Sequence, residues 1–98
     1  MHAIVDFCLV PFTSEDSIAP LVAICQGVLE KAGLKHELHA NGTGVEGELS
    51  SIFAAIEACH EAIHQEGAGR IFTTIRVGTR VDKQDTMADK IARAKAHL

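Results

Sequence analysis

Polar and apolar residues alternate along the first segment of the chain. Over His2–Pro11 every second residue is apolar, namely Ala3, Val5, Phe7 and Leu9. This is the period of a strand that buries one of its faces. Pro11 is compatible with a strand because it ends the run, where its missing N–H removes no ladder bond. The pattern predicts a strand over His2–Pro11.

Three more short runs have strand character: Lys35–Ala40, Thr43–Leu49 and Arg70–Val77. The first two are joined by Asn41-Gly42, a dipeptide that readily adopts the positive φ values of a two-residue hairpin turn. We expect these two runs to form a β-hairpin. The last run places four residues of one parity on a buried face: Ile71, Thr73, Ile75 and Val77.

A helical spacing follows the polar turn that ends the first strand. Its apolar stripe consists of Ile18, Val22, Cys25 and Leu29. Ser17 can cap the start of this helix, and Pro20 lies in the first turn, where its missing N–H is harmless. Gly33 stands just past the end. The sequence predicts a first helix between Ser17 and Gly33.

Two further segments show the same spacing. One opens at Ser50 or Ser51, is closed by Gly67, and buries Ile52, Ile56, Cys59 and Ile63. The other is capped by Asp85 or Thr86 and carries Met87, Ile91, Ala94 and Leu98. The first of these stripes is typical of a helix with one face in a core.

The order of these elements is βαββαβ followed by a terminal α. This order predicts an α+β fold of the ferredoxin-like, split βαβ type, with a four-stranded antiparallel sheet in the order 4-1-3-2. Two helices cover one face of such a sheet and leave the other open. With 98 residues and no linker-like stretch, we expect one domain over residues 1–98.

Charged residues fall on the parity that faces away from the helices. The strand order places Asp6 in a middle strand, between Glu46 or Glu48 on one side and Thr74 and Arg76 on the other. In one interpretation, the acid and the arginine form an ordinary cross-strand pair, worth a few tenths to about 1 kcal/mol. In the other, the carboxylates outnumber the arginine and need a cationic ligand. The acidic excess favours a ligand.

Apolar residues share that same uncovered face: Ile4, Cys8, Val10 and Phe72. A sheet face of this kind is too apolar to be left in water, which predicts a homo-oligomer interface containing a small polar ligand site. Because closed symmetry suits a self-complementary sheet surface, we expect the chain to assemble with itself.

Composition narrows the class of partner. The net charge is −4 and the only aromatic residues are four phenylalanines, which argues against nucleic-acid binding through phosphates or base stacking. The N-terminal segment lacks the basic region and cleavage site of a signal peptide, and no membrane partner is expected. Three scattered cysteines without CxxC spacing favour reduced thiols and a cytoplasmic location.

Several polar residues are candidates for ligand contacts. Glu46 has room around it because Gly44 and Gly47 lie nearby, although the glycines could equally serve a strand bulge. Thr43 offers a hydroxyl at the end of the hairpin. Thr13 and Ser14 offer two more before the first helix, where the alternative is an ordinary turn or cap role.

Metal binding and catalysis are disfavoured. His60 and His64 share a helix face, but a zinc site needs a third or fourth ligand and none accompanies them in a known spacing. Cys8 faces the acidic side of the sheet, where carboxylates lower the thiolate fraction of a thiol. No nucleophile triad, phosphate loop or dinucleotide motif is present. We expect a non-enzyme without a metal or cofactor.

Three segments resemble a known family: Asn41–Glu48 (Asn-Gly-Thr-Gly-Val-Glu-Gly-Glu), Cys59-His60-Glu61, and Arg70–Val77 (Arg-Ile-Phe-Thr-Thr-Ile-Arg-Val). They are similar to the thiamine-binding protein family, nearly end to end. The resemblance implies a homotetramer assembled through sheet faces that binds thiamine, or its hydroxymethylpyrimidine part, without transforming it. The permanent cation of thiamine suits the acidic face. Gly44 replaces a larger residue of the family pattern.

Two hypotheses follow. In the first, the chain binds thiamine or its precursor at an oligomer interface through Asp6, Thr13, Ser14, Thr43, Glu46, Glu48, Thr74 and Arg76. In the second, it is a regulatory or interaction module whose open face serves only homo-oligomerisation. The fold cannot separate them, because this plan hosts many functions. The acidic excess favours the first.

Overall fold

A four-stranded antiparallel sheet forms the centre of the molecule. The computed structural model describes residues 1–98, and its strands, in the order β2-β3-β1-β4, are β1 (His2–Pro11), β2 (Lys35–His39), β3 (Gly42–Glu48) and β4 (Ile71–Thr79). The helices are α1 (Ala19–Lys31), α2 (Leu49–Gln65) and α3 (Met87–Lys95). The predicted ferredoxin-like α+β fold and the 4-1-3-2 order, read here from the opposite edge, are confirmed.

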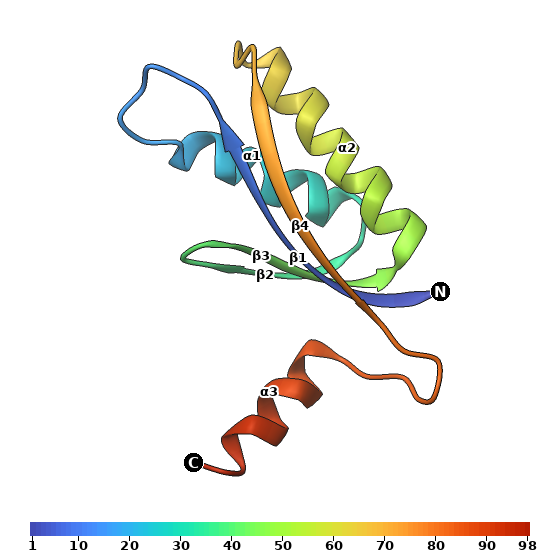
Figure 1. The fold of residues 1–98 in the computed structure, drawn as a ribbon. Coiled ribbons are helices and arrows are strands. Elements are labelled where there is room, and N and C mark those ends of the chain that lie inside the picture. The colour runs from blue at the N-terminus through green and yellow to red at the C-terminus, as the bar shows by residue number, and fades with distance from the viewer.

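The core lies between one face of the sheet and helices α1 and α2 (Figure 1). The sheet contributes Ala3, Val5, Phe7 and Val45, and the helices contribute Cys25, Leu29, Ile52, Ala55, Ile56, Cys59 and Ile63. The alternation predicted for β1 and the stripe predicted for α2 are therefore both confirmed. None of the three helices has the length and apolar character needed to span a lipid bilayer.

The helix starts differ from those predicted for the first two helices. Ile18 is the N-cap of α1, and Ser17 instead accepts a hydrogen bond from the Ala19 N–H at 3.2 Å. Glu48 is the N-cap of α2, with no side-chain cap. Strand β3 runs directly into α2, so the last strand residue takes the capping position and no serine is needed.

The hairpin turn lies one residue earlier than predicted. Strands β2 and β3 close on the pair His39↔Gly42, so Ala40 and Asn41 form the turn. No non-glycine residue has a positive φ, and the prediction of an Asn41-Gly42 turn was wrong. Gly42 serves the strand instead, because a Cβ there would lie 2.7 Å from the carbonyl oxygen of Phe7.

The register of β1 with β3 also differs from the prediction. Asp6 pairs with Gly44, whereas Glu46 pairs with Ile4. The acids are therefore not neighbours in one cross-strand row. The ladder between β1 and β3 begins at the pair Phe7↔Thr43, and this pair sets the register of the others. On the other side, the predicted pairing of Asp6 with Arg76 is confirmed.

Helix α3 covers part of the sheet face that the fold otherwise leaves open (Figure 1). Its first residue, Met87, is buried, and the Met87 sulfur would lie 2.9 Å from a Cβ placed on Gly44. The absence of a side chain at this glycine thus makes room for the helix. Thr86 caps α3 in a capping box with Asp89, as the sequence predicted. Leu98 lies beyond the helix and is exposed.

We expect the core face of α2 to dominate stability. Ile52 is fully buried, whereas the adjacent Phe53 is 43% exposed. Ile52→Ala should lower the free energy of unfolding by about 2–5 kcal/mol, because it removes buried methylene groups and leaves a cavity. Phe53→Ala is the control and should cost about 1 kcal/mol or less. Urea titration at one protein concentration measures both, and equal losses would contradict this account.

Candidate functional site

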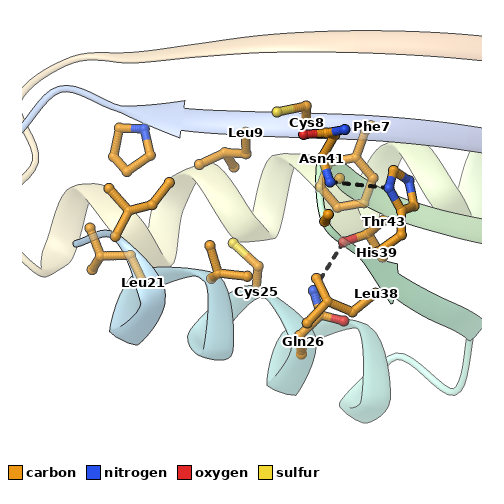
Figure 2. Close-up of a pocket in the computed structure, with 15 residues that line it drawn as sticks. Phe7, Cys8, Leu9, Leu21, Cys25, Gln26, Leu38, His39, Asn41 and Thr43 are labelled. Carbon is orange, nitrogen blue, oxygen red and sulfur yellow. Dashed lines mark hydrogen bonds between the residues drawn. The ribbon is translucent and has the colours of Figure 1, made fainter.

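The two halves of the sheet differ in length, and the difference creates a notch. Pairing between β1 and β3 stops at Phe7↔Thr43, whereas pairing between β1 and β4 continues to Pro11↔Ile71. Residues Cys8–Pro11 therefore have a strand partner on one side only. A pocket of about 310 Å³ lies between this free edge, helix α1 and the tip of the hairpin (Figure 2). We call it the notch pocket.

The walls of the notch pocket are mainly apolar. Nine of its fifteen lining residues are hydrophobic, from β1 (Phe7, Cys8, Leu9), α1 (Ile18, Leu21, Val22, Cys25) and the hairpin (Leu38, Ala40). A mostly apolar cavity of this size with a few polar groups is the usual form of a small-molecule site. The volume lies near the lower end of the range for such sites, so a small ligand fits best.

Two polar side chains meet inside the notch pocket. Thr43 is buried on the helix-facing side of β3, and the Gln26 amide of α1 donates a hydrogen bond to its hydroxyl oxygen at 3.0 Å (Figure 2). The carbonyl oxygen of Gln26, one amide hydrogen and the Thr43 hydroxyl hydrogen are not used in this bond. These groups can orient a ligand that both donates and accepts.

His39 connects the notch pocket to the charged face. The backbone N–H of Asn41 donates to its Nδ1 at 3.2 Å, so Nδ1 is the acceptor, and Nε2 donates to the Asp6 carboxylate at 2.6 Å. These two bonds select one imidazole tautomer. Arg76 donates to the other Asp6 oxygen at 3.4 Å. His39, a lining residue, thus links the pocket to a carboxylate held by two donors, and we call Asp6 and Arg76 together the charged rim.

Glu46 and Glu48 lie apart from this group. Glu46 is only 6% exposed, with its Oε1 3.8 Å from the Lys35 ammonium and its Oε2 4.0 Å from His2 Nε2. Oε1 has no hydrogen-bond partner. Burying a carboxylate is costly without a nearby cation, so Lys35 provides its charge compensation. Glu48 pairs with the N-terminal ammonium.

The remaining candidates from the sequence lie outside the notch pocket. Thr13 and Ser14 belong to the connection between β1 and α1, where the Thr13 hydroxyl accepts a hydrogen bond from the Glu15 N–H at 3.2 Å. This is the turn role given above as the alternative. Thr74 is exposed on β4, opposite Cys8. The structure therefore brings together Asp6 and Arg76, and places Thr43 in the adjacent pocket.

Sequence reasoning missed Gln26, His39 and Asn41. Gln26 is the single amide side chain of α1, but only the packing of that helix shows that it faces a threonine. His39 shares the face of Asp6 because it pairs with Gly42. The alternation of side chains along β2 predicts this shared face, provided that the turn is assigned to Ala40 and Asn41.

The histidines of α2 have structural partners. His60 Nε2 lies 2.7 Å from the Thr73 hydroxyl, and the His64 Nδ1–H donates to the Ala68 carbonyl at 2.7 Å. Their ring centroids are 6.3 Å apart. No group of three or more histidine, cysteine, aspartate or glutamate side chains is arranged to hold a metal ion.

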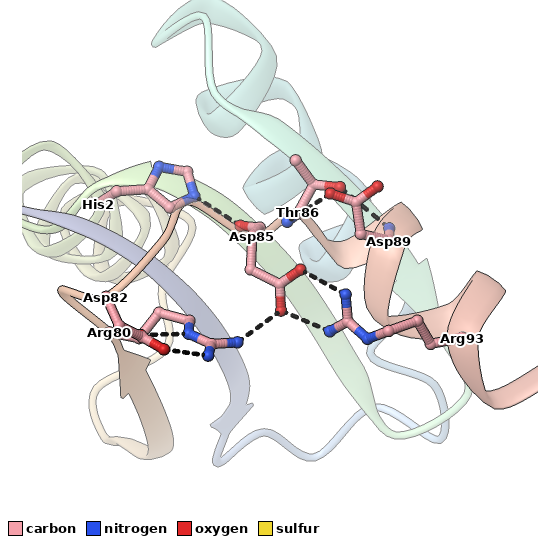
Figure 3. A network of polar contacts seen from close by, with 7 residues as sticks. All are labelled: His2, Arg80, Asp82, Asp85, Thr86, Asp89 and Arg93. Atoms are coloured by element: carbon pink, nitrogen blue, oxygen red, sulfur yellow. Dashed lines mark hydrogen bonds and ion pairs between the residues drawn. The ribbon is translucent and has the colours of Figure 1, made fainter.

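A second polar cluster holds α3 against the sheet (Figure 3). Arg93 of α3 donates to both oxygens of Asp85, at 3.0 and 2.7 Å, and His2 Nε2 donates to the Asp85 carbonyl at 3.1 Å. Asp85 is 6% exposed. Its bond with Arg93 holds the pKa of the Asp85 carboxyl below its usual value, against the opposing effect of burial. We call the Asp85–Arg93 pair the α3 latch.

Comparison with known proteins finds relatives that match this chain over nearly its whole length. The sequence profile of the family described as thiamine-binding protein matches residues 5–95. A UPF0045 protein of Synechocystis is 48% identical over 98 residues, covering 100% of this chain and 81% of the relative. The UPF0045 protein YqgV of Bacillus subtilis is 40% identical over 101 residues, covering 98% and 97%.

Two solved structures share the fold. A hypothetical protein from Methanocaldococcus jannaschii superposes with a TM-score of 0.87 at 26% identity, covering 99% of this chain and 98% of that one. A Thermotoga maritima protein, described as acting in thiamine biosynthesis or salvage, superposes with a TM-score of 0.83, covering 96% and 99%. Its 18% identity supports likeness of fold alone.

The α3 latch should open in acid. Because the pKa of Asp85 is lower in the folded chain, the latch stabilises α3 fully above the ordinary aspartate pKa of about 3.9 and loses this effect as pH falls through the lower folded value. The methyl group of Met87, the buried first residue of α3, reports the change. Its NMR shift should stay constant from about pH 7 to about pH 4 and then move towards that of exposed Met1.

A variant separates the latch from general acid effects. In Arg93→Gln the Met87 methyl should already resemble that of Met1 at neutral pH, because the Asp85 carboxylate has lost its bidentate partner. A wild-type Met87 shift that does not change down to about pH 2 would contradict the latch.

Proposed function

The chain belongs to the thiamine-binding protein family, and we propose that it binds thiamine or its hydroxymethylpyrimidine part in the notch pocket without transforming it. The observation that carries this proposal is the notch pocket, a cavity of about 310 Å³ with apolar walls and a Gln26–Thr43 pair inside. The Thermotoga maritima protein with the same fold, described as acting in thiamine biosynthesis or salvage, agrees with a ligand of this class.

The chemistry of the ligand matches the chemistry of the pocket. An aminopyrimidine ring is flat and apolar on its faces, with donors and acceptors only on its edge. The walls of the notch pocket suit the ring faces, and Gln26 and Thr43 suit the amino group and a ring nitrogen. The thiazolium cation of thiamine would then lie towards His39, whose partner Asp6 carries a negative charge that it shares with Arg76.

Within this proposal the site residues from the sequence divide into three groups. Thr43 contacts the ligand, while Asp6 and Arg76 form the charged rim. Glu46 and Glu48 belong instead to the region near α3 and the N-terminus. Thr13, Ser14 and Thr74 line no part of the notch pocket.

The geometry of His39 supports binding rather than catalysis. A histidine that acts as a general base needs a ring nitrogen free to take a proton. Both ring nitrogens of His39 are engaged, one by Asn41 N–H and the other by Asp6. His39 is thus positioned as a structural link.

We further propose that the chain is a homotetramer assembled through the uncovered part of its sheet. Val10 and Phe72 pair across β1 and β4 and are 40% and 64% exposed. They lie at the end of the sheet that carries the notch pocket, since Leu9 and Pro11 line it. A partner on this face would lie beside the ligand and shield it from water.

The exposed Val10–Phe72 pair also favours the second candidate function. An interaction or regulatory module would use this face for association alone. The two functions differ in a simple respect, because only the first predicts thiamine or hydroxymethylpyrimidine binding. No measurable binding of either compound by the wild-type protein in the millimolar range would leave the interaction module as the better account.

Removing the Thr43 hydroxyl should weaken thiamine binding. Thr43→Val keeps the shape of the side chain and removes a hydrogen bond worth about 0.5–1.5 kcal/mol, or roughly two- to twelvefold in affinity. Calorimetric titration with thiamine and with hydroxymethylpyrimidine measures the effect.

Two variants serve as controls for this titration. Thr74→Val is the same chemical change on exposed β4 and should bind as the wild type does. Glu46→Gln should also leave the affinity unchanged, since Glu46 does not line the notch pocket. A loss in Glu46→Gln without a loss in Thr43→Val would move the site to the face under α3.

A charge on the uncovered face should disrupt the tetramer. Val10→Lys places an ammonium group beside Phe72, where burial against a second copy would be costly, and we expect monomers in sedimentation velocity at tens of micromolar. Val81→Lys is the matched control, because Val81 is 91% exposed in the connection to α3. A monomeric wild type would refute the tetramer.

A further inference from the structure

Positive charge gathers at one corner of a chain that is acidic overall. Three of its nine lysine and arginine residues, Arg80, Lys90 and Arg93, line a pocket of about 190 Å³ beside the start of β1. One carboxylate, Asp85, lies in the same wall. We call this cavity the basic pocket. Residues 2–4 of β1 line the basic pocket, whereas residues 7–9 and 11 line the notch pocket. The two pockets therefore lie towards opposite ends of that strand.

The two guanidinium groups are held in place and still have free donors (Figure 3). Arg93 uses two N–H groups on Asp85, which leaves three of its five donors. Arg80 uses Nε and one terminal nitrogen on Asp82. Its other terminal nitrogen lies 3.7 Å from Asp85, too far for a hydrogen bond. Asp85 therefore orders Arg93 and Asp82 orders Arg80, and neither carboxylate uses all the donors of its arginine.

Lys90 adds a third cation without a partner in this corner. The ion pairs here join Arg80, Asp82, Asp85 and Arg93, and Lys90 takes part in none of them. It lies on α3 one turn before Arg93, on the same side of the helix. Asp82 and Asp89 are close by but outside the wall: Asp82 binds Arg80 and Asp89 belongs to the capping box of α3.

These groups form the donor set that binds a doubly charged oxyanion. Planar guanidinium groups bind phosphate oxygens in a fork, and lysine supplies a point charge. Three cations and the Asp85 carboxylate line the wall, and Asp82 pairs with Arg80 from outside it. These five groups carry one net positive charge, which an added anion would offset. The volume equals that of about six water molecules at ~30 Å³ each, which accommodates a phosphate group.

We infer that the basic pocket is an anion site for inorganic phosphate or a small phosphate monoester. The ligand oxygens accept hydrogen bonds from Arg80 and Arg93, and the Lys90 ammonium group forms an ion pair with the ligand. The site is separate from the proposed thiamine site, because no residue lines both pockets. Failure of one proposal therefore leaves the other intact.

Titration of the intact protein with inorganic phosphate and with methyl phosphate, in low-salt buffer up to about 10 mM ligand, tests the site. The amide shifts of Gly78, Thr79 and Lys90 should move with a saturating curve in the wild type. Comparison of the two affinities identifies the source of the phosphate group. Methyl phosphate can bind as tightly as inorganic phosphate, or more tightly, only if the site is open enough to accept an ester.

Charge-matched variants separate a specific site from general attraction. Lys90→Gln should weaken phosphate binding roughly fivefold or more, while its amide shifts without ligand show that α3 stays in place. Lys95→Gln removes the same charge from the same helix outside the pocket and should bind as the wild type does. Equal weakening in both variants, or no saturating shift in the wild type, would overturn the proposal.

Discussion

The packing of β1 against α1 and α2 is the constraint on which the rest of the structure depends. Ala3, Val5 and Phe7 are almost fully buried in the core, and because successive side chains of a strand point to opposite faces, this burial decides where every other residue of β1 points. Asp6 must then lie on the second face. The charged rim, the apolar surface around Val10 and the floor under α3 all follow from this one alternation.

The short hairpin leaves a cavity beside that sheet. Had β2 and β3 been as long as β1 and β4, their side chains would fill the space beside Leu9 and Pro11. Instead the turn at Ala40 and Asn41 ends the hairpin early, and the gap becomes a cavity between α1 and a free strand edge. Gly42 allows the hairpin to approach the Phe7 carbonyl closely, which places His39 at the rim of that cavity.

Helix α3 divides the second face into two regions with different chemistry. The end near Gly44 and Ile4 is covered by Met87 and held by the α3 latch, and the Glu46 carboxylate there is buried. The end with Val10 and Phe72 stays uncovered. Assembly is therefore proposed for the uncovered end, ligand binding for the notch pocket beside α1, and anion binding for the corner where Arg80, Lys90 and Arg93 come together.

The periodicity of the sequence was sufficient for the element order, the fold class, the strand order and the core stripe of α2, because burial repeats every second residue in a strand and every third or fourth in a helix. It also placed Asp6 and Arg76 opposite each other. Periodicity could not determine the register, because a shift of two residues keeps every side chain on its face. Parity alone therefore could not decide whether Glu46 or Gly44 is the neighbour of Asp6. The position of α3, the contact of Gln26 with Thr43 and the notch pocket required the folded chain, since each depends on how segments distant in sequence end and pack in space.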